Sequence, residues 1–140
     1  MIVGFTGTRE GMTGEQEGTV SQLINDLGTT QFHHGDCEGA DLQAAMIAAD
    51  DWGIKLVVHP PENDKLRAWC YADVLHDPKP YLDRNRDIVD ACDVLLAAPK
   101  GYEEELRSGT WATIRYAQKV GKPVKIIWPN GSVLTVGVGE

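Results

Sequence analysis

The sequence predicts a single α/β domain built on a mainly parallel, doubly wound sheet with helices on both faces. Short segments bounded by glycine, proline or polar residues, which are typical of strands, alternate with segments whose apolar residues recur at helical spacing. This alternation implies parallel strands joined by helices that cover both faces of the sheet. The 140 residues are the length of one domain, so we expect residues 1–140 to fold as a single unit.

Five short segments are predicted to form the parallel part of the sheet, and one more follows them. The five are Ile2–Thr6, Thr29–His33, Lys55–His59, Val94–Ala98 and Pro123–Trp128. The last segment, Val133–Val138, comes after the turn signal Asn130-Gly131, so we expect it to form a C-terminal hairpin strand.

Helices are predicted between these strands. The first spans about 14–27: Thr13 and Gln16 fit the capping-box pattern, and Gly28 is a typical stop. The third spans about 81–91, and the fourth begins at Thr110.

The second helix ends before Gly53, and residues 61–80 are the least regular part of the chain, with a short helix within 64–72. Apolar residues at helical spacing predict the buried stripe of the second helix. They are Leu42, Ala45, Met46, Ala49 and Trp52.

The commonest topology for five such strands is the Rossmann-like strand order 3-2-1-4-5. The first strand then lies beside the fourth, and the chain leaves these two strands in opposite directions. Ligands of open α/β sheets bind in the crevice at this switch point, outside the carboxyl ends of the strands. We therefore expect binding residues in the loops that follow the strands.

Three of these loops and one helix start carry residues suited to an anion. Ser108-Gly109-Thr110 lies at the start of a helix, where unpaired N–H groups and the helix dipole favour a phosphate, although Ser and Thr are also common as plain helix caps. Glycine lets a ligand approach the backbone closely. The predicted ligand-binding residues are Gly7, Thr8, Arg9, Gly35, Asp36, Arg84, Asn85, Ser108, Gly109 and Thr110.

Composition excludes several classes of partner. The net charge of −8 argues against binding a nucleic-acid polymer, which needs a basic face. No run of about 18 apolar residues and no signal peptide is present, so we expect no membrane partner. Three widely spaced cysteines suggest neither disulfides nor zinc, so we expect a reducing, cytoplasmic setting, no metal and no cofactor.

The order of these motifs resembles that of the SLOG superfamily, which includes LOG-type phosphoribohydrolases and DNA-processing-A-like proteins. The resemblance rests on Gly7-Thr8-Arg9, the loop His34–Asp41, Arg84-Asn85 and Ser108-Gly109-Thr110, and it covers about residues 1–129. It is nearest to the small stand-alone members of the YspA-like kind. It implies a modified Rossmann domain that binds a nucleotide or a nucleotide-derived ligand, such as an ADP-ribose-type or cyclic nucleotide signal, as a sensor or a sequestering protein.

The resemblance also implies an alternative function, that of an N-glycosidase acting on nucleoside monophosphates or of a deoxyribosyltransferase-like enzyme. LOG enzymes carry a glutamate where this chain has Thr113, and glycosidic cleavage needs a carboxylate near the sugar. The candidates for a substitute catalytic carboxylate are Asp36 and Glu38. Asp36 also fits a helix-capping role, which we favour for Asp41. Because relatives often form dimers, we expect a homodimer or a higher homo-oligomer.

Overall fold

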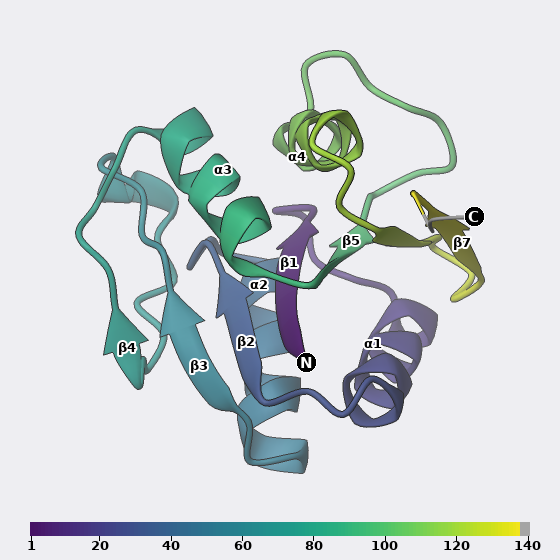
Figure 1. The fold of residues 1–140 in the computed structure, drawn as a ribbon, viewed down its shortest axis with the longest axis horizontal. Helices are drawn as coiled ribbons and strands as arrows, with labels where there is room; N and C mark the ends of the chain where they lie inside the picture. Colours follow the sequence, from purple (N-terminus) through teal and green to yellow (C-terminus); the bar gives the residue numbers. More distant parts are fainter. Residues whose placement is uncertain (138–140) are drawn as a thin grey trace.

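The computed structural model describes residues 1–137 and contains one seven-stranded sheet in the order β4-β3-β2-β1-β5-β6-β7 (Figure 1). All neighbouring strands are parallel except β6 and β7, which form the predicted antiparallel hairpin. The strands are β1 (Ile2–Gly7), β2 (Gln31–His34), β3 (Lys55–Val58), β4 (Val74–Leu75), β5 (Val94–Ala98), β6 (Val124–Ile127) and β7 (Val133–Val136).

The predicted count of five strands in the parallel sheet is therefore wrong. The five predicted strands correspond to β3, β2, β1, β5 and β6 and are neighbours in that order, but β4 adds a sixth parallel strand at the edge beside β3. Val74 and Leu75 are both exposed, so this strand has no buried face to mark it in the sequence. The predicted end of the hairpin strand, Val138, lies outside the described residues.

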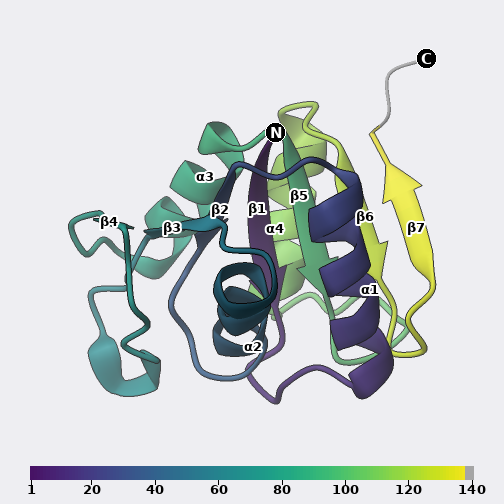
Figure 2. The same ribbon diagram turned by 90° about the horizontal axis from the view of Figure 1, so that it is seen from below.

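The four α-helices of residues 1–137 cover the sheet on both faces, as Figure 2 shows. α1 and α2 pack on one face around Phe5 and Phe32, while α3 and α4 pack on the other around Leu95. Their bounds are α1 (Gly14–Asp26), α2 (Ala40–Met46), α3 (Tyr81–Ala91) and α4 (Gly109–Lys119). A π-helical turn, Ile47–Asp51, continues α2, and the short helix predicted within 64–72 is a 3₁₀ turn, Asp64–Leu66.

The predicted buried stripe of α2 is mostly wrong, because Leu42, Met46 and Trp52 are exposed. The helix faces the sheet with small residues instead: Ala40, Ala44 and Ala48 are fully buried. A Cβ atom on Gly7 would lie 2.6 Å from the Cβ of Ala40, so the helix packs too closely on β1 for large side chains to fit between them.

The predicted capping box at the start of α1 is confirmed, and it also supports the edge of the sheet where the strands end. The Thr13 hydroxyl accepts from the Gln16 backbone, and the Gln16 side chain accepts from the Thr13 backbone. The buried Gln16 amide then donates to the carbonyls of Pro99, at 2.9 Å, and Ile127, at 3.0 Å. One side chain thus begins a helix and satisfies two carbonyls at the carboxyl ends of β5 and β6.

The pairing of β1 with β5 defines the switch point. Gly7, the last residue of β1, is in register with Ala98, the last residue of β5, and the Thr8 amide donates to the Ala98 carbonyl at 3.0 Å. The chain therefore leaves both strands at one place, where the loops to α1 and to α4 begin. Among residues 1–137, no helix is both long enough and apolar enough to cross a membrane.

Candidate functional site

A cavity of about 320 Å³ lies at the switch point, between the turn after β1 and the start of α4. Six of the predicted binding residues line it. They are Gly7, Thr8, Arg9, Ser108, Gly109 and Thr110. The structure therefore brings together the two segments that the topology predicted to meet.

The start of α4 presents polar groups to this cavity. The Ser108 hydroxyl caps the helix by accepting from the Trp111 amide at 3.3 Å. The amides of Gly109 and Thr110 find no acceptor among residues 1–137, as expected for the first N–H groups of a helix. The Thr110 side chain is 6% exposed, and its hydroxyl also lacks a hydrogen-bond partner within the described chain. These three groups are free to bind a ligand.

The turn after β1 forms the opposite wall. Thr8 is held in place, because its hydroxyl accepts from the Glu10 amide at 3.1 Å and its carbonyl accepts from the amides of Gly11 and Ala40. The Arg9 side chain is exposed, lines the cavity and makes no ion pair within 1–137. A rigid backbone turn thus carries a free guanidinium.

Two further cations, Lys100 and Arg107, line the cavity, and the sequence analysis did not single them out. Lys100 lies 3.4 Å from a Glu10 oxygen and 3.7 Å from a Glu105 oxygen, so its charge is partly balanced. The cavity therefore holds three cationic and two acidic side chains together with the positive end of the α4 dipole, which makes its wall positive despite the acidic chain.

Tyr81 also lines the cavity and was not among the predicted binding residues. A Cβ atom on Gly109 would lie 1.9 Å from the Tyr81 hydroxyl oxygen, so the tyrosine reaches the start of α4 only because residue 109 is glycine. The guanidinium of Arg84 lies over the Tyr81 ring, 4.7 Å from its centre. Tyr81 is the first residue of α3, and its position at this edge of the sheet is the signal that could have found it.

Arg84, Asn85 and Gly35 lie together beside the cavity but do not line it. Arg84 is buried, and it donates to Asn85 Oδ1 at 2.6 Å, to the Gly35 and His59 carbonyls and to the Cys37 sulfur. These bonds occupy its guanidinium, so Arg84 joins α3 to the ends of β2 and β3. All three line a small space of about 20 Å³, together with Gly7 and Asp41.

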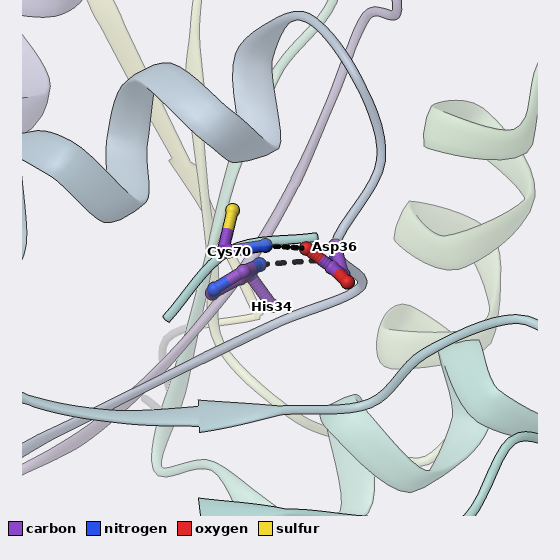
Figure 3. A group of neighbouring side chains, drawn as sticks. All are labelled: His34, Asp36 and Cys70. Carbon is purple, nitrogen blue, oxygen red and sulfur yellow. Dashed lines mark hydrogen bonds between the residues drawn. The ribbon is translucent and has the colours of Figure 1, made fainter. Parts of the chain in front are cut away.

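Asp36 is fully buried and does not line the cavity. One of its carboxylate oxygens accepts from Arg67 Nε at 2.6 Å. The other accepts from the Cys70 amide at 2.8 Å (Figure 3). Both oxygens therefore hold the 61–80 segment against the end of β2. The other catalytic candidate, Glu38, is exposed and does not line the cavity. Thr113, which stands where LOG enzymes carry a glutamate, donates through Oγ1 to the Gly109 carbonyl inside α4.

His34, Asp36 and Cys70 place one potential metal ligand each within 4.8 Å of one another (Figure 3). Their donor atoms are committed to the fold, however. His34 Nδ1 accepts from the Asp36 amide at 3.0 Å, so the proton of the neutral ring lies on Nε2, which then has no lone pair for a metal. Burial, together with the neighbouring Asp36, raises the pKa of the Cys70 thiol to about 12. The group is therefore a poor metal site.

Three histidines make the stability of the domain dependent on pH. Burial lowers the pKa of His33 and of His34 to about 4, and that of His59 to about 3. The unfolded chain protonates these imidazoles near pH 6.5, whereas the folded chain does not until the pH is lower, so stability falls as the pH falls from about 6.5 to 4. Burial raises the pKa of Asp41 to about 6, which opposes this trend, but only one group does so.

We expect the melting temperature at pH 5 to be more than about 5 °C below that at pH 7, measured by circular dichroism at constant ionic strength. Replacing His59 by glutamine reduces the difference, because one of the three groups no longer titrates. A melting temperature that is equal or higher at pH 5 contradicts this assignment.

Comparison with solved structures identifies the class of fold. No protein-family model matches the chain, and no curated protein matches it significantly. Solved structures do match. The molybdenum cofactor binding protein of Rippkaea orientalis has a TM-score of 0.68 at 24% identity, over 89% of this chain and 74% of that one. The molybdenum cofactor carrier protein of Chlamydomonas reinhardtii has a TM-score of 0.64 at 22% identity, over 89% of this chain and 75% of that one.

DNA processing protein A from Streptococcus pneumoniae also matches, with a TM-score of 0.68 at 24% identity, over 97% of this chain. The match spans about half of that protein, 52% of its length. These neighbours show that the chain has a Rossmann-like fold, as the resemblance to DNA-processing-A-like proteins implied.

Proposed function

We propose that this domain binds a nucleotide or a nucleotide-derived small molecule, with a phosphate group in the cavity between the turn after β1 and α4. The observation that carries the proposal is the meeting of unpaired helix amides with the free guanidinium of Arg9 around one cavity. Backbone N–H groups at a helix start suit phosphate oxygens, and an arginine fork binds two of them at once. The Thr110 hydroxyl supplies a further bond.

The volume and charge of the cavity support the same ligand class. About 320 Å³ is at the small end of ligand pockets, which suits a phosphate and a sugar better than a whole dinucleotide. The acidic chain repels polyanions at long range, but a local group of cations and a helix dipole can hold one small anion. The structural neighbours that bind or carry molybdenum cofactor support small-molecule binding by this fold, so that cofactor belongs among the ligands to be tested.

The arrangement favours binding over glycosidic cleavage. Cleavage needs a carboxylate beside the sugar, but Asp36 uses both oxygens on Arg67 and Cys70, and Glu38 lies away from the cavity. The acidic residues that do line the cavity, Glu10 and Glu105, lie beside Lys100. We therefore propose a sensor or sequestering protein of the cytoplasm, acting as a homodimer or a higher homo-oligomer, rather than an N-glycosidase or a deoxyribosyltransferase-like enzyme.

Isothermal titration calorimetry tests the proposal with AMP, ADP-ribose, cyclic ADP-ribose isomers, cyclic dinucleotides and molybdenum cofactor. At least one of the nucleotide ligands is expected to bind with a stoichiometry of one per chain. Incubation of the same protein with nucleoside monophosphates, followed by chromatography, is expected to give no free base. Absence of heat with every nucleotide contradicts the proposed ligand class, and release of base contradicts the preference for binding over catalysis.

A further inference from the structure

We infer that a second, apolar cavity beside the phosphate cavity holds the planar ring of the ligand, so that the domain recognises a nucleoside monophosphate unit in two adjoining compartments. This inference rests on the proposed function. It adds the class of chemical group that binds next to the phosphate and the cavity in which that group binds. It also assigns a role to the irregular 61–80 segment, which does not line the phosphate cavity.

The two cavities adjoin each other. The second has a volume of about 540 Å³ and shares Arg9 and Tyr81 with the first. A ligand whose phosphate lies at Gly109 can therefore extend between the Tyr81 ring and the Arg9 side chain into the second cavity. A pentose is the spacer that joins a phosphate to a ring in a nucleoside monophosphate, and it would lie at this boundary.

The second cavity has the chemistry of a ring-binding site. Pro61, Leu66, Pro80 and Tyr81 give it a largely apolar lining, whereas the phosphate cavity is mainly polar. Leu66 is 39% exposed and Tyr81 42% exposed, so their apolar surfaces face solvent unless a ligand covers them. A flat heterocycle gains affinity by covering such surfaces and by stacking on an aromatic ring.

The wall of this cavity is held in place before any ligand binds. The Leu66 carbonyl accepts from the Glu38 amide at 2.9 Å, and the Glu62 amide donates to the Lys79 carbonyl at 2.9 Å. The buried ion pair of Asp36 with Arg67 fixes the residue after Leu66. A wall ordered in this way reduces the entropy that binding must overcome. Asp36 is then a positioning residue for the ring compartment rather than a group that contacts the ligand.

The test compares AMP with ribose 5-phosphate, which carries the phosphate and the sugar but no ring. Calorimetry on the full chain is expected to show that AMP binds at least about tenfold more tightly, because covering apolar surface contributes to AMP binding alone. Leu66→Asn removes most of that advantage and leaves ribose 5-phosphate within about twofold of its original affinity, since phosphate contacts are unchanged. The matched control is Leu82→Asn, because Leu82 is an exposed leucine on α3 that lines neither cavity.

The outcomes separate this inference from the function on which it rests. Equal affinities of the wild-type chain for AMP and ribose 5-phosphate overturn the ring compartment and leave the phosphate cavity supported. Unchanged AMP binding by Leu66→Asn, or an equal loss with Leu82→Asn, also overturns it. If the wild-type chain binds neither compound, this inference falls, and the proposed function falls with it only if the other nucleotides of the calorimetry series also give no heat. Circular dichroism of each variant checks that the fold is retained.

Discussion

Replacing Asp36 by alanine is expected to lower the free energy of unfolding by about 3–5 kcal/mol, because the change leaves the buried charge of Arg67 without its partner. The exposed fractions of the two side chains are 0% for Asp36 and 10% for Arg67. The Cys70 amide also loses its acceptor. Asp36 has a φ of 58°, a conformation that alanine adopts less readily than aspartate or asparagine, which adds to the loss.

Urea denaturation of the wild-type and variant chains measures this difference. Asp36→Asn keeps a residue that tolerates the backbone conformation while removing the charge, so it separates strain from the ion pair. Asp26→Ala is the control, because Asp26 is exposed and, within residues 1–137, accepts one side-chain bond, from Gln22. The role of Asp36 is contradicted if Asp36→Ala changes the free energy of unfolding by less than about 1 kcal/mol, the upper end of the usual range for a surface ion pair.

Replacing Arg9 by alanine is expected to weaken AMP binding by about 10- to 100-fold, the range for losing a charge-assisted hydrogen bond. Arg9 is exposed and makes no ion pair within the described residues, so its side chain is not needed for folding. Stability is therefore expected to change by less than about 0.5 kcal/mol. The loss is expected to be largest at low salt, because a phosphate contact is screened by salt.

Calorimetry with AMP at two salt concentrations measures this effect. Arg86→Ala is the matched control, because Arg86 is an exposed arginine on α3 that lies over the Tyr116 ring and lines a different cavity. Equal losses of affinity in the two variants would show that only the net charge matters, and the assignment of Arg9 to the phosphate would then be wrong.

The strand order around the switch point could be predicted from the sequence because local signals agreed with it. Thr13 and Gln16 form the predicted capping box, and the register of Gly7 with Ala98 brings together the loops that were expected to meet. The start of α4 acts mainly through its unpaired backbone N–H groups, and the position of these groups follows from the topology of the sheet. Topology was the part of the fold that the sequence specified best.

Side chains that act through long-range contacts could not be placed in this way. Asp36 and Arg67 are 31 residues apart along the chain, with α2 and β3 between them, and no periodic pattern pairs them. Arg84 was predicted to bind a ligand, yet it lies four residues before Ile88 on the buried face of α3, and that spacing is the signal that could have placed it inside. Tyr81 lines the cavity because the start of α3 lies against Gly109, and no local sequence pattern shows that contact.

The most direct test of the phosphate cavity is a titration of ¹⁵N-labelled protein with AMP, followed through the backbone amide signals. The largest shifts are expected at Gly109 and Thr110, whose amides have no acceptor within residues 1–137, and at Gly7 across the cavity. Gly101, whose Cβ position faces open space in the loop after β5, is expected to shift far less. Binding of AMP that leaves Gly109 and Thr110 unshifted while other residues move would contradict the account.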